Sequence, residues 1–433
     1  ASPEVMMALL FVAIVLATVS LVDHPRFLTG LVLVVLAAVS YAAHTRHVTL
    51  VVSAAVALVW LVHRRRLTRL EGGVLVAILL GLALLAHLYT AWAIDVTWVS
   101  VNERAGSGAL LERFGRPDRI AKTTLGMTWY QLVSTLGVIG LGAWILVAST
   151  ARLAVAEGIG LHRRHAAAVM LHTLPIAAVG AVFMAGSDEQ IQFVAQMVYG
   201  RYWEAIVPPI LVLGLLYVAS TSAVAVRRSI VIVVGVTASV GGLLAVLRRD
   251  DVQQSLDALG GLGVGRRILG LVPFLPDSKS LPVLQITVVA VVLMLGVYAP
   301  LLVAPAWRHA RATTFSLIGL LAVVGILSVD SRLDRHNPDP ESLASIRVPT
   351  EIGLVSPDTS VQFHAPGGRL QVWNLYQFVY SDIPLSRYDP ESTARPDFVF
   401  AKKRQPILQQ VGGVVVWEDP HRNVALWQLP EDT

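Results

Sequence analysis

The chain has 433 residues, of which 55% are hydrophobic and 15% are charged, and its formal net charge is +5. Its mean hydropathy of +0.64 excludes an ordinary soluble globular domain. It contains no cysteine, which excludes a disulfide framework and a thiolate metal site. The composition therefore predicts an α-helical polytopic membrane protein.

About ten segments are apolar over the length of about 20 residues that a membrane-spanning helix needs. The predicted spans are residues 5–22, 27–43, 47–62, 73–93, 127–151, 166–186, 207–225, 229–247, 284–304 and 315–329. The second, third and last are the shortest. Because the chain runs from Ala1 straight into an apolar segment, we expect a longer protein with at least one further span and one exported loop before it.

Arginines crowd every second connection between the predicted spans. They are Arg26, Arg64, Arg65, Arg66, Arg69, Arg163, Arg164, Arg227, Arg228, Arg308 and Arg311. Short loops rich in Arg and Lys stay in the cytoplasm, so these connections are predicted to be cytoplasmic and both termini to face outward. No basic run is interleaved with aromatic residues, so the positive charge predicts contact with membrane lipid and no binding of nucleic acid.

The opposite, longer connections are predicted to be exported because they mix acidic with basic residues. They cover residues 94–126, 187–206 and 248–283. In the first of them, residues 108–122 fit an amphipathic helix that lies on the membrane surface.

The most informative polar run lies at the exported mouth of one predicted span. It reads Tyr199-Gly200-Arg201-Tyr202-Trp203-Glu204. The following Pro208-Pro209 pair predicts a helix that begins with its positive end near Arg201, whose guanidinium suits bidentate binding of a phosphate. The further substrate-binding candidates of the run are Tyr199, Tyr202 and Glu204. The alternatives are an arginine that pairs with Glu204 or with lipid headgroups, and an ordinary aromatic belt.

Two carboxylates and two histidines are further candidates. Asp188 and Glu189 lie at the exported end of the preceding span, where they would bind substrate or a divalent cation, or belong to a solvated loop. His172 and His87 lie inside spans, where a packed, hydrogen-bonded histidine is expected and a ligand is the alternative. No residues have metal-ligand spacing, so no metal site built by the protein is predicted.

Residues 331–433 are predicted to form a small extracytoplasmic α/β domain, while residues 1–330 form the helical membrane domain. A polar linker from Asp330 to Pro340 joins them. Short apolar runs bounded by Gly, Pro and Asp predict strands at residues 361–364, 370–373, 397–401, 414–417 and 424–427, and a short helix over 404–411. The aromatic residues that either form a sugar-stacking surface or belong to the core are Trp373, Tyr376, Trp417 and Trp427.

Three motifs resemble those of actinobacterial polytopic glycosyltransferases of the GT-C class. They are Thr128-Trp129-Tyr130-Gln131-Leu132-Val133 followed by Gly137 to Gly142, the Tyr-Gly-Arg-Tyr-x-Glu run before Pro208, and Trp417-Glu418-Asp419-Pro420 with Ala425-Leu426-Trp427. The likeness covers most of residues 73–433. It implies an enzyme with an exported active site that transfers a sugar from a polyprenyl-phosphate carrier to a glycan or protein acceptor of the cell envelope.

In that class the catalytic base is an Asp or Glu of the first exported loop, which this chain is expected to lack. No catalytic residue is therefore assigned, and a divalent cation is the one cofactor that stays open. Two other functions also stay open. A transporter or flippase would use Arg201 as its binding charge but would show polar or helix-breaking residues in the middle of several spans. The other is a non-catalytic scaffold of the cell envelope.

Overall fold

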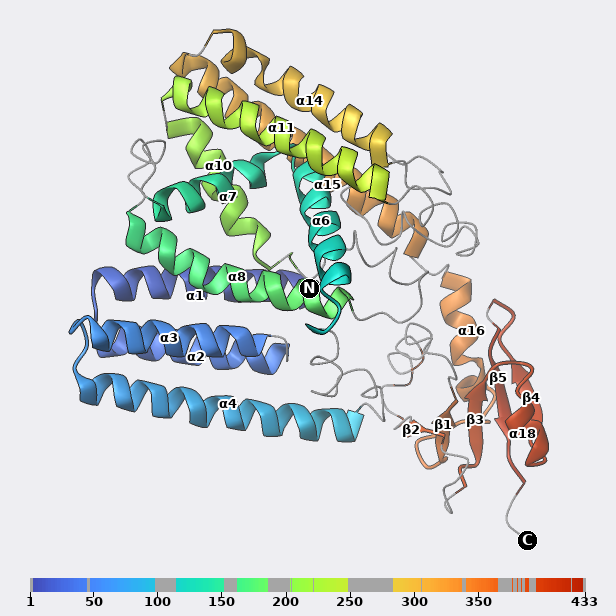
Figure 1. Cartoon of the computed structure of the whole chain (residues 1–433). Coiled ribbons are helices and arrows are strands. Elements are labelled where there is room, and N and C mark those ends of the chain that lie inside the picture. Colours follow the sequence, from blue (N-terminus) through green and yellow to red (C-terminus); the bar gives the residue numbers. More distant parts are fainter. Residues whose placement is uncertain are drawn as a thin grey trace. The chain divides into compact units, whose positions relative to one another are not determined.

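The computed structural model describes residues 3–44, 47–97, 114–151, 162–185, 203, 205–220, 222–247, 283–304, 306–336, 340–364, 376, 380, 383, 386–388, 395–421 and 423–430. The chain forms two compact units (Figure 1). A helical unit comprises Ala1–Thr90 and Ala105–Arg332, and a unit that contains the sheet comprises Ala91–Arg104 and Leu333–Thr433.

The described part of the helical unit contains mostly apolar helices. They are α1 (Pro3–Asp23), α2 (Phe27–Ala43), α3 (Val48–His63), α4 (Arg69–Thr97), α6 (Pro117–Ser134), α7 (Val138–Thr150), α8 (Arg163–Ala185), α10 (Val207–Ser220), α11 (Ala223–Leu247), α14 (Val283–Val303) and α15 (Trp307–His336). Among the described residues, 6 helices are long and apolar enough to cross a membrane, or up to 7 if the bent pair α6 and α7 counts as one span. The apolar helices α2, α3 and α10 are shorter. These helices support a multi-pass membrane protein.

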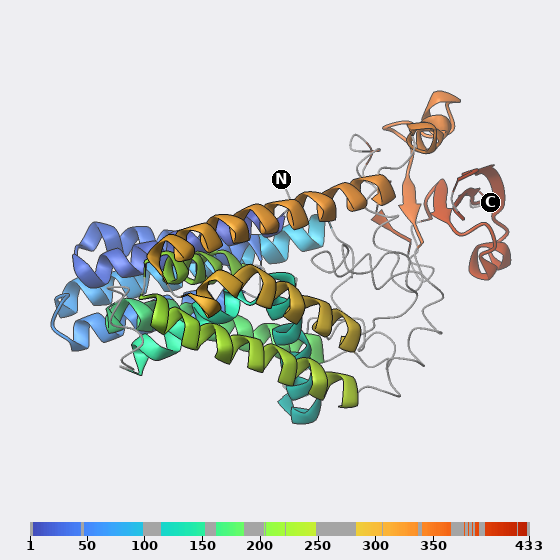
Figure 2. The same cartoon turned by 90° about the horizontal axis from the view of Figure 1, so that it is seen from above.

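The basic short connections lie together at one end of the helical unit. Figures 1 and 2 both show that α1 meets α2, α3 meets α4, α10 meets α11 and α14 meets α15 at this end, where α8 also begins. The arginines that mark every second connection in the sequence are therefore on the same side of the bundle. This is the arrangement expected if that side faces the cytoplasm.

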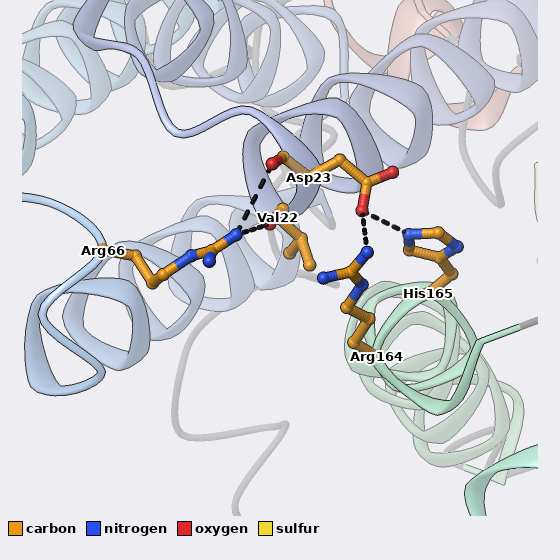
Figure 3. Close-up of polar contacts among 5 residues, drawn as sticks. All are labelled: Val22, Asp23, Arg66, Arg164 and His165. Atoms are coloured by element: carbon orange, nitrogen blue, oxygen red, sulfur yellow. Dashed lines mark hydrogen bonds and ion pairs between the residues drawn. The ribbon is translucent and has the colours of Figure 1, made fainter.

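A polar cluster ties three helices together at the basic end (Figure 3). The Asp23 carboxylate at the end of α1 accepts hydrogen bonds from Arg164 (2.9 Å) and His165 (2.8 Å) of α8. Arg66, which follows α3, donates to the backbone carbonyls of Val22 (3.0 Å) and Asp23 (3.5 Å). The final carbonyls of a helix have no partner within the helix and attract cations, so Arg66 completes the end of α1.

The contact between α7 and α10 is made through two glycines. A Cβ atom on Gly142 would overlap the carbonyl oxygen of Ile210, and one on Gly214 would overlap that of Val138. The contact is reciprocal, since glycine and carbonyl are one helical turn apart on each helix. Membrane helices associate by such close packing because lipid supplies no hydrophobic drive between them.

The second unit contains a mixed sheet with both faces covered. Its described elements are α16 (Pro340–Glu351), β1 (Val361–Phe363), β2 (Ser386–Arg387), β3 (Phe398–Ala401), α18 (Pro406–Gln410), β4 (Val414–Glu418) and β5 (Ala425–Gln428). The strand order is β2-β1-β3-β5-β4; β1 pairs parallel with β2 and β3, and β5 pairs antiparallel with β3 and β4. One core contains Ile346, Phe363, Tyr376, Tyr380 and Phe400, and the other contains Tyr388, Val399, Leu408 and Trp427.

Tyr380 and Asp419 supply the polar contacts of the first core. The Tyr380 hydroxyl donates to the carbonyl of Ile346, and burial raises the pKa of Tyr380 above its ordinary value. The fully buried carboxylate of Asp419 accepts hydrogen bonds from the hydroxyl of Tyr376 (2.8 Å) and the backbone N–H of His421 (2.8 Å). Since a buried carboxylate is costly unless it is hydrogen-bonded, these donors explain why the unit tolerates Asp419.

Most predicted elements of the second unit are present. The strands predicted at residues 361–364, 397–401, 414–417 and 424–427 and the short helix are found, whereas residues 370–373 lie outside the described residues. The short strand β2 was not predicted.

Tyr376 and Trp427 are buried, which confirms the core interpretation for these two, while Trp417 is half-buried and packs edge-on against Phe400.

Two boundaries differ from the sequence-based prediction. The linker predicted to begin at Asp330 is still helical, because α15 continues to His336 as a polar extension of an apolar helix. The single span predicted over residues 127–151 is two helices that bend by 116° relative to each other.

The glycine contact predicts opposite outcomes for two similar substitutions. We expect Gly142→Ala to destabilise the helical unit by about 1–3 kcal/mol, because the added methyl group displaces the backbone of α10. Gly235 of α11 is an exposed helical glycine with nothing within 4 Å of its Cβ position. Gly235→Ala should therefore be neutral or stabilise by up to about 1 kcal/mol.

Thermal unfolding of both variants in the same detergent measures the difference. A melting temperature for Gly142→Ala equal to that of Gly235→Ala would rule out the close backbone contact.

Candidate functional site

The six residues predicted to bind substrate lie outside the residues that the structure describes. They are Arg201, Tyr199, Tyr202, Glu204, Asp188 and Glu189. Trp203 is the one described member of the aromatic run. Its indole Nε1 donates to the carbonyl of Ala177 in α8 (3.0 Å), and its ring packs against the core of the bundle. Trp203 therefore fixes one point of the predicted substrate-binding run on α8.

A sharp break separates α6 from α7. Leu136 and Gly137 have φ angles of 49° and 75°, which reverse the direction of the chain. The Thr135 hydroxyl donates to the carbonyl of Gln131 (2.6 Å), and the hydroxyl of Tyr298 in α14 donates to the carbonyl of Leu136 (3.2 Å). The Gln131 carbonyl also accepts from the backbone N–H of Thr135 (3.3 Å), whereas the Leu136 carbonyl is paired by Tyr298. Because an unpaired backbone group inside a membrane protein costs several kcal/mol, Tyr298 stabilises the break.

Helix α6 runs across the direction of most of the other helices in both views (Figures 1 and 2). Its second half is anchored from α14, because the indole of Trp129 donates to the hydroxyl of Thr287 (2.9 Å). Trp129 is fully buried, and Tyr130 packs in the same core with Leu244 and Ile286. The helix predicted over residues 108–122 is therefore found only in its last part, as the start of α6, and residues 98–113 lie outside the described residues.

A cavity of about 400 Å³ lies between α6, α7, α8, α10 and α11. Its apolar lining includes Leu132, Ile139, Ile206, Ile210 and Val233, and its residues with polar atoms are Thr128, Gln131, Trp144, Thr173 and Trp203. Some of its lining side chains are exposed on the outer side of the bundle, namely Ala143, Val147, Ile232 and Val236. In a membrane protein such a surface faces lipid, so the cavity is accessible to a lipid chain.

One hydrogen-bond donor in this cavity has no acceptor. The indole Nε1 of Trp144 is buried and has no partner among the described residues. A buried donor without a partner is costly, and an oxygen of a bound molecule would remove that cost. The cavity therefore offers apolar walls for a hydrocarbon chain and one neutral donor that would fix its orientation.

The size of the cavity suits a substantial part of a lipid chain. An apolar cavity of about 150 Å³ stays dry and binds one benzene molecule. The present cavity has more than twice that volume, and its lining offers few partners to water. Among the described residues, no group of three or more His, Asp or Glu side chains is arranged to hold a metal ion.

His172 of α8 is fully buried and joins three helices. Its Nε2 lies 2.8 Å from the hydroxyl of Thr18 in α1, and its Nδ1 lies 2.6 Å from the hydroxyl of Ser53 in α3. The expected role of a packed, hydrogen-bonded histidine is confirmed. His87 is also hydrogen-bonded, through Nδ1 to the hydroxyl of Tyr41 (3.1 Å), but it is exposed, so the packed position expected for it is not found.

Each hydrogen bond around His172 can be assigned a donor and an acceptor. Each of the two hydroxyls also lies within hydrogen-bond distance of a carbonyl, of Ile14 for Thr18 (2.9 Å) and of Leu50 for Ser53 (3.1 Å). A neutral imidazole donates through one nitrogen and accepts through the other. One hydroxyl therefore accepts from the ring and donates to its carbonyl, while the other donates to the ring. Both ring nitrogens are satisfied without a charge inside the bundle.

No family model, curated protein or solved structure matches the chain. The resemblance to GT-C glycosyltransferases thus depends on the three motifs alone. Two of these motifs contain a described residue with a structural role. Trp129 anchors α6 to α14, and Asp419 accepts a hydrogen bond from Tyr376 in the core of the sheet unit. Sequence reasoning missed Trp144, whose unpaired N–H no pattern in the sequence signals.

The hydroxyl contacts of His172 predict a difference between two buried serines. We expect Ser53→Ala to destabilise the protein by about 0.6–1.7 kcal/mol, the range of side-chain hydrogen bonds between membrane helices. Ser149 of α7 is equally buried, and its hydroxyl has no partner among the described residues. Ser149→Ala should be neutral or stabilise the protein, because it removes a buried hydroxyl that has no partner.

Unfolding of both variants in mixed micelles supplies the comparison. Equal effects of the two substitutions would show that the contact between Ser53 and His172 contributes nothing to stability.

Proposed function

We propose that the chain is a membrane glycosyltransferase, or the larger part of one, that moves a sugar from a polyprenyl-phosphate carrier to an extracytoplasmic acceptor. The acceptor is a glycan or protein of the cell envelope. The observation that carries the proposal is the apolar cavity beside the α6–α7 break, whose wall includes Trp203. In the sequence, Trp203 follows Arg201 by two positions, so the segment that contributes to the cavity wall also carries a candidate phosphate ligand.

The two parts of a lipid-linked sugar have different needs. The polyprenyl chain needs apolar walls, which the cavity offers, and its phosphate needs a cation, for which Arg201 is the candidate. A polyprenyl phosphate is a good leaving group once cations hold its charge. The remaining requirement is a base for the acceptor hydroxyl, and no residue of this chain is assigned to that role.

The proposal includes a topology. The apolar helices would cross the membrane about ten times, with the arginine-rich connections in the cytoplasm. The C-terminal sheet unit would then be extracytoplasmic, on the side of the predicted substrate-binding run. The motif resemblance to GT-C enzymes supports the same placement.

A transporter or flippase of a lipid-linked anion is the second candidate. One observation favours it: the pair α6 and α7 is a discontinuous helix next to a cavity. Transporters often bind their substrates at such breaks. A transporter would move the lipid between leaflets and leave the sugar attached to its carrier.

The test uses the protein in bilayer nanodiscs with a polyprenyl-phosphate-linked sugar. We expect saturable binding in the wild type and its loss in Arg201→Ala, whereas Arg201→Lys should retain a little, because a point charge replaces a bidentate group. Arg228→Ala, at an exposed position near the start of α11 at the basic end, is the matched control and should bind like the wild type. Equal binding by Arg201→Ala and Arg228→Ala would remove Arg201 from the site.

The cavity is tested separately with two alanines that are exposed on membrane helices. Ala143 of α7 lines the cavity, whereas Ala77 lies on α4. Ala143→Phe should weaken lipid binding by about tenfold or more, while Ala77→Phe should leave it unchanged. Appearance of a glycosylated acceptor supports the transferase, and movement of the intact lipid between leaflets of proteoliposomes supports the transporter.

A further inference from the structure

The turn between α3 and α4 lies at the basic end of the helical unit and contains Arg64, Arg65 and Arg66 (Figures 1 and 2). Arg65 has a φ angle of 53°, which is the left-handed conformation. Its N–H donates to the carbonyl of Val62 (2.9 Å), and the N–H of Arg66 donates to that of Leu61 (2.9 Å). These two bonds form a Schellman motif with Arg65 at the C′ position. Glycine is usual there, because the Cβ atom of any other residue strains the left-handed backbone.

The turn is held firmly between the two helices. Leu67 is buried, and a Cβ atom on Gly72 of α4 would overlap the side chain of Val62 in α3. The start of α4 is closed by a capping box. The Thr68 hydroxyl accepts from the N–H of Glu71 (3.1 Å), and the Glu71 carboxylate accepts from the N–H (3.0 Å) and the hydroxyl (2.7 Å) of Thr68. The strained backbone at Arg65 is therefore a fixed feature of the fold.

The arginines of the basic end fall into two groups. The first group binds helix ends: Arg66 caps α1, Arg163 donates to the carbonyl of Thr150 at the end of α7 (3.0 Å), and Arg164 pairs with Asp23 (Figure 3). The second group is exposed and has no partner among the described residues. Its members are Arg26, Arg64, Arg65, Arg69, Arg227, Arg228 and Arg308.

The described carboxylates next to these arginines are already engaged. Asp23 accepts from Arg164 and His165, and Glu71 belongs to the capping box of α4. Neither is paired with a member of the second group in the described part of the chain. The positive charge of Arg64 and Arg65 is therefore compensated by solvent ions or by another molecule.

The composition of the two helices gives the position of the turn in a membrane. Helix α3 is apolar up to Val62, and α4 becomes apolar again after Glu71. The exposed Trp60 lies in the last turn of α3, and tryptophan is enriched where a membrane helix meets the lipid headgroups. Arg64 and Arg65 thus lie where the chain leaves the hydrocarbon region, at the level of the lipid phosphates.

We propose that the α3–α4 turn docks on the headgroups of anionic phospholipids, with Arg64 and Arg65 as its lipid-binding cations. A guanidinium group binds phosphate oxygens bidentately, and each basic residue near an anionic membrane surface strengthens the attraction about fivefold. This contact explains why the strained C′ position holds an arginine and not a glycine. The proposal does not depend on the proposed transferase activity or on which side of the membrane the turn faces.

The experiment measures thermal unfolding of the whole chain in detergent micelles with added phosphatidylglycerol, phosphatidylcholine or inorganic phosphate. A molecule that binds the folded protein raises its melting temperature in a concentration-dependent way. We expect phosphatidylglycerol to raise the melting temperature more than equal concentrations of phosphatidylcholine, which has no net charge, or of inorganic phosphate. Added salt should reduce this difference, because it screens exposed charges.

Two substitutions separate the charge of Arg65 from its backbone. Without lipid, Arg65→Gly should unfold at the wild-type temperature or above it, because glycine relieves the left-handed strain. It should nevertheless need about fivefold more phosphatidylglycerol for half of the rise. Arg65→Lys keeps both the charge and the strain and should retain most of the response. Arg404→Gly removes an exposed arginine of the sheet unit and should respond like the wild type.

Four results would overturn the proposal. Equal responses of the wild type to phosphatidylglycerol and phosphatidylcholine would show that the lipid charge is not recognised. An equal response to inorganic phosphate would indicate an anion site without a role for lipid. Equal responses of Arg65→Gly and Arg404→Gly would remove Arg65 from the contact. A clear fall in the melting temperature of Arg65→Gly without lipid would assign Arg65 to the stability of the fold.

Discussion

The helical unit depends on how the backbone is satisfied where α6 meets α7. Within the bend of 116°, backbone N–H groups still bond the carbonyls of Gln131, Leu132, Val133 and Thr135. The Leu136 carbonyl accepts from the hydroxyl of Tyr298 in α14, and the Thr135 hydroxyl is a second donor to the carbonyl of Gln131. Because a backbone group without a partner is costly inside a membrane protein, Tyr298 stabilises the break and with it the crosswise position of α6.

The cavity follows from this break. Because α6 turns across the bundle, its second half covers the cavity from one side, while α7 and α10 form other parts of the wall. Close packing of these two helices through Gly142 and Gly214 keeps that part of the wall compact. The second half of α6 is held to α14 by the hydrogen bond from Trp129 to Thr287.

The apolar helices and most of the strands could be predicted from the sequence, because runs of about 20 apolar residues and short bounded runs are local signals. The break at Leu136 could not be predicted from the sequence, because it is stabilised by Tyr298, which is 162 residues away in the chain. Trp129 was noticed only as part of a motif, and its partner Thr287 is equally distant in sequence. Trp144 could not be recognised at all, because an unpaired donor is defined by the absence of neighbours in three dimensions.

The candidate substrate-binding residues, unlike the cavity, are known only from the sequence. Arg201 and its neighbours are candidates because their chemistry suits a phosphate, and they lie outside the described residues. Only Trp203 connects that prediction with the structure, through its bond to Ala177 and its place in the cavity wall. The proposed lipid part of the site therefore depends on the geometry of the cavity. The proposed phosphate part depends on the sequence alone.

The described polar groups of the bundle favour a fixed site over a moving one. A transporter alternates between two states, so the contacts around its binding site must be exchanged at low cost. Here the break is held from α14 at two points, by Tyr298 and by Trp129 through Thr287. His172, the described histidine in the middle of the bundle, is satisfied by neutral hydroxyls on two helices and is not available to a moving ion. A site built this way would suit the proposed transferase, which would hold its lipid substrate still while the sugar is transferred.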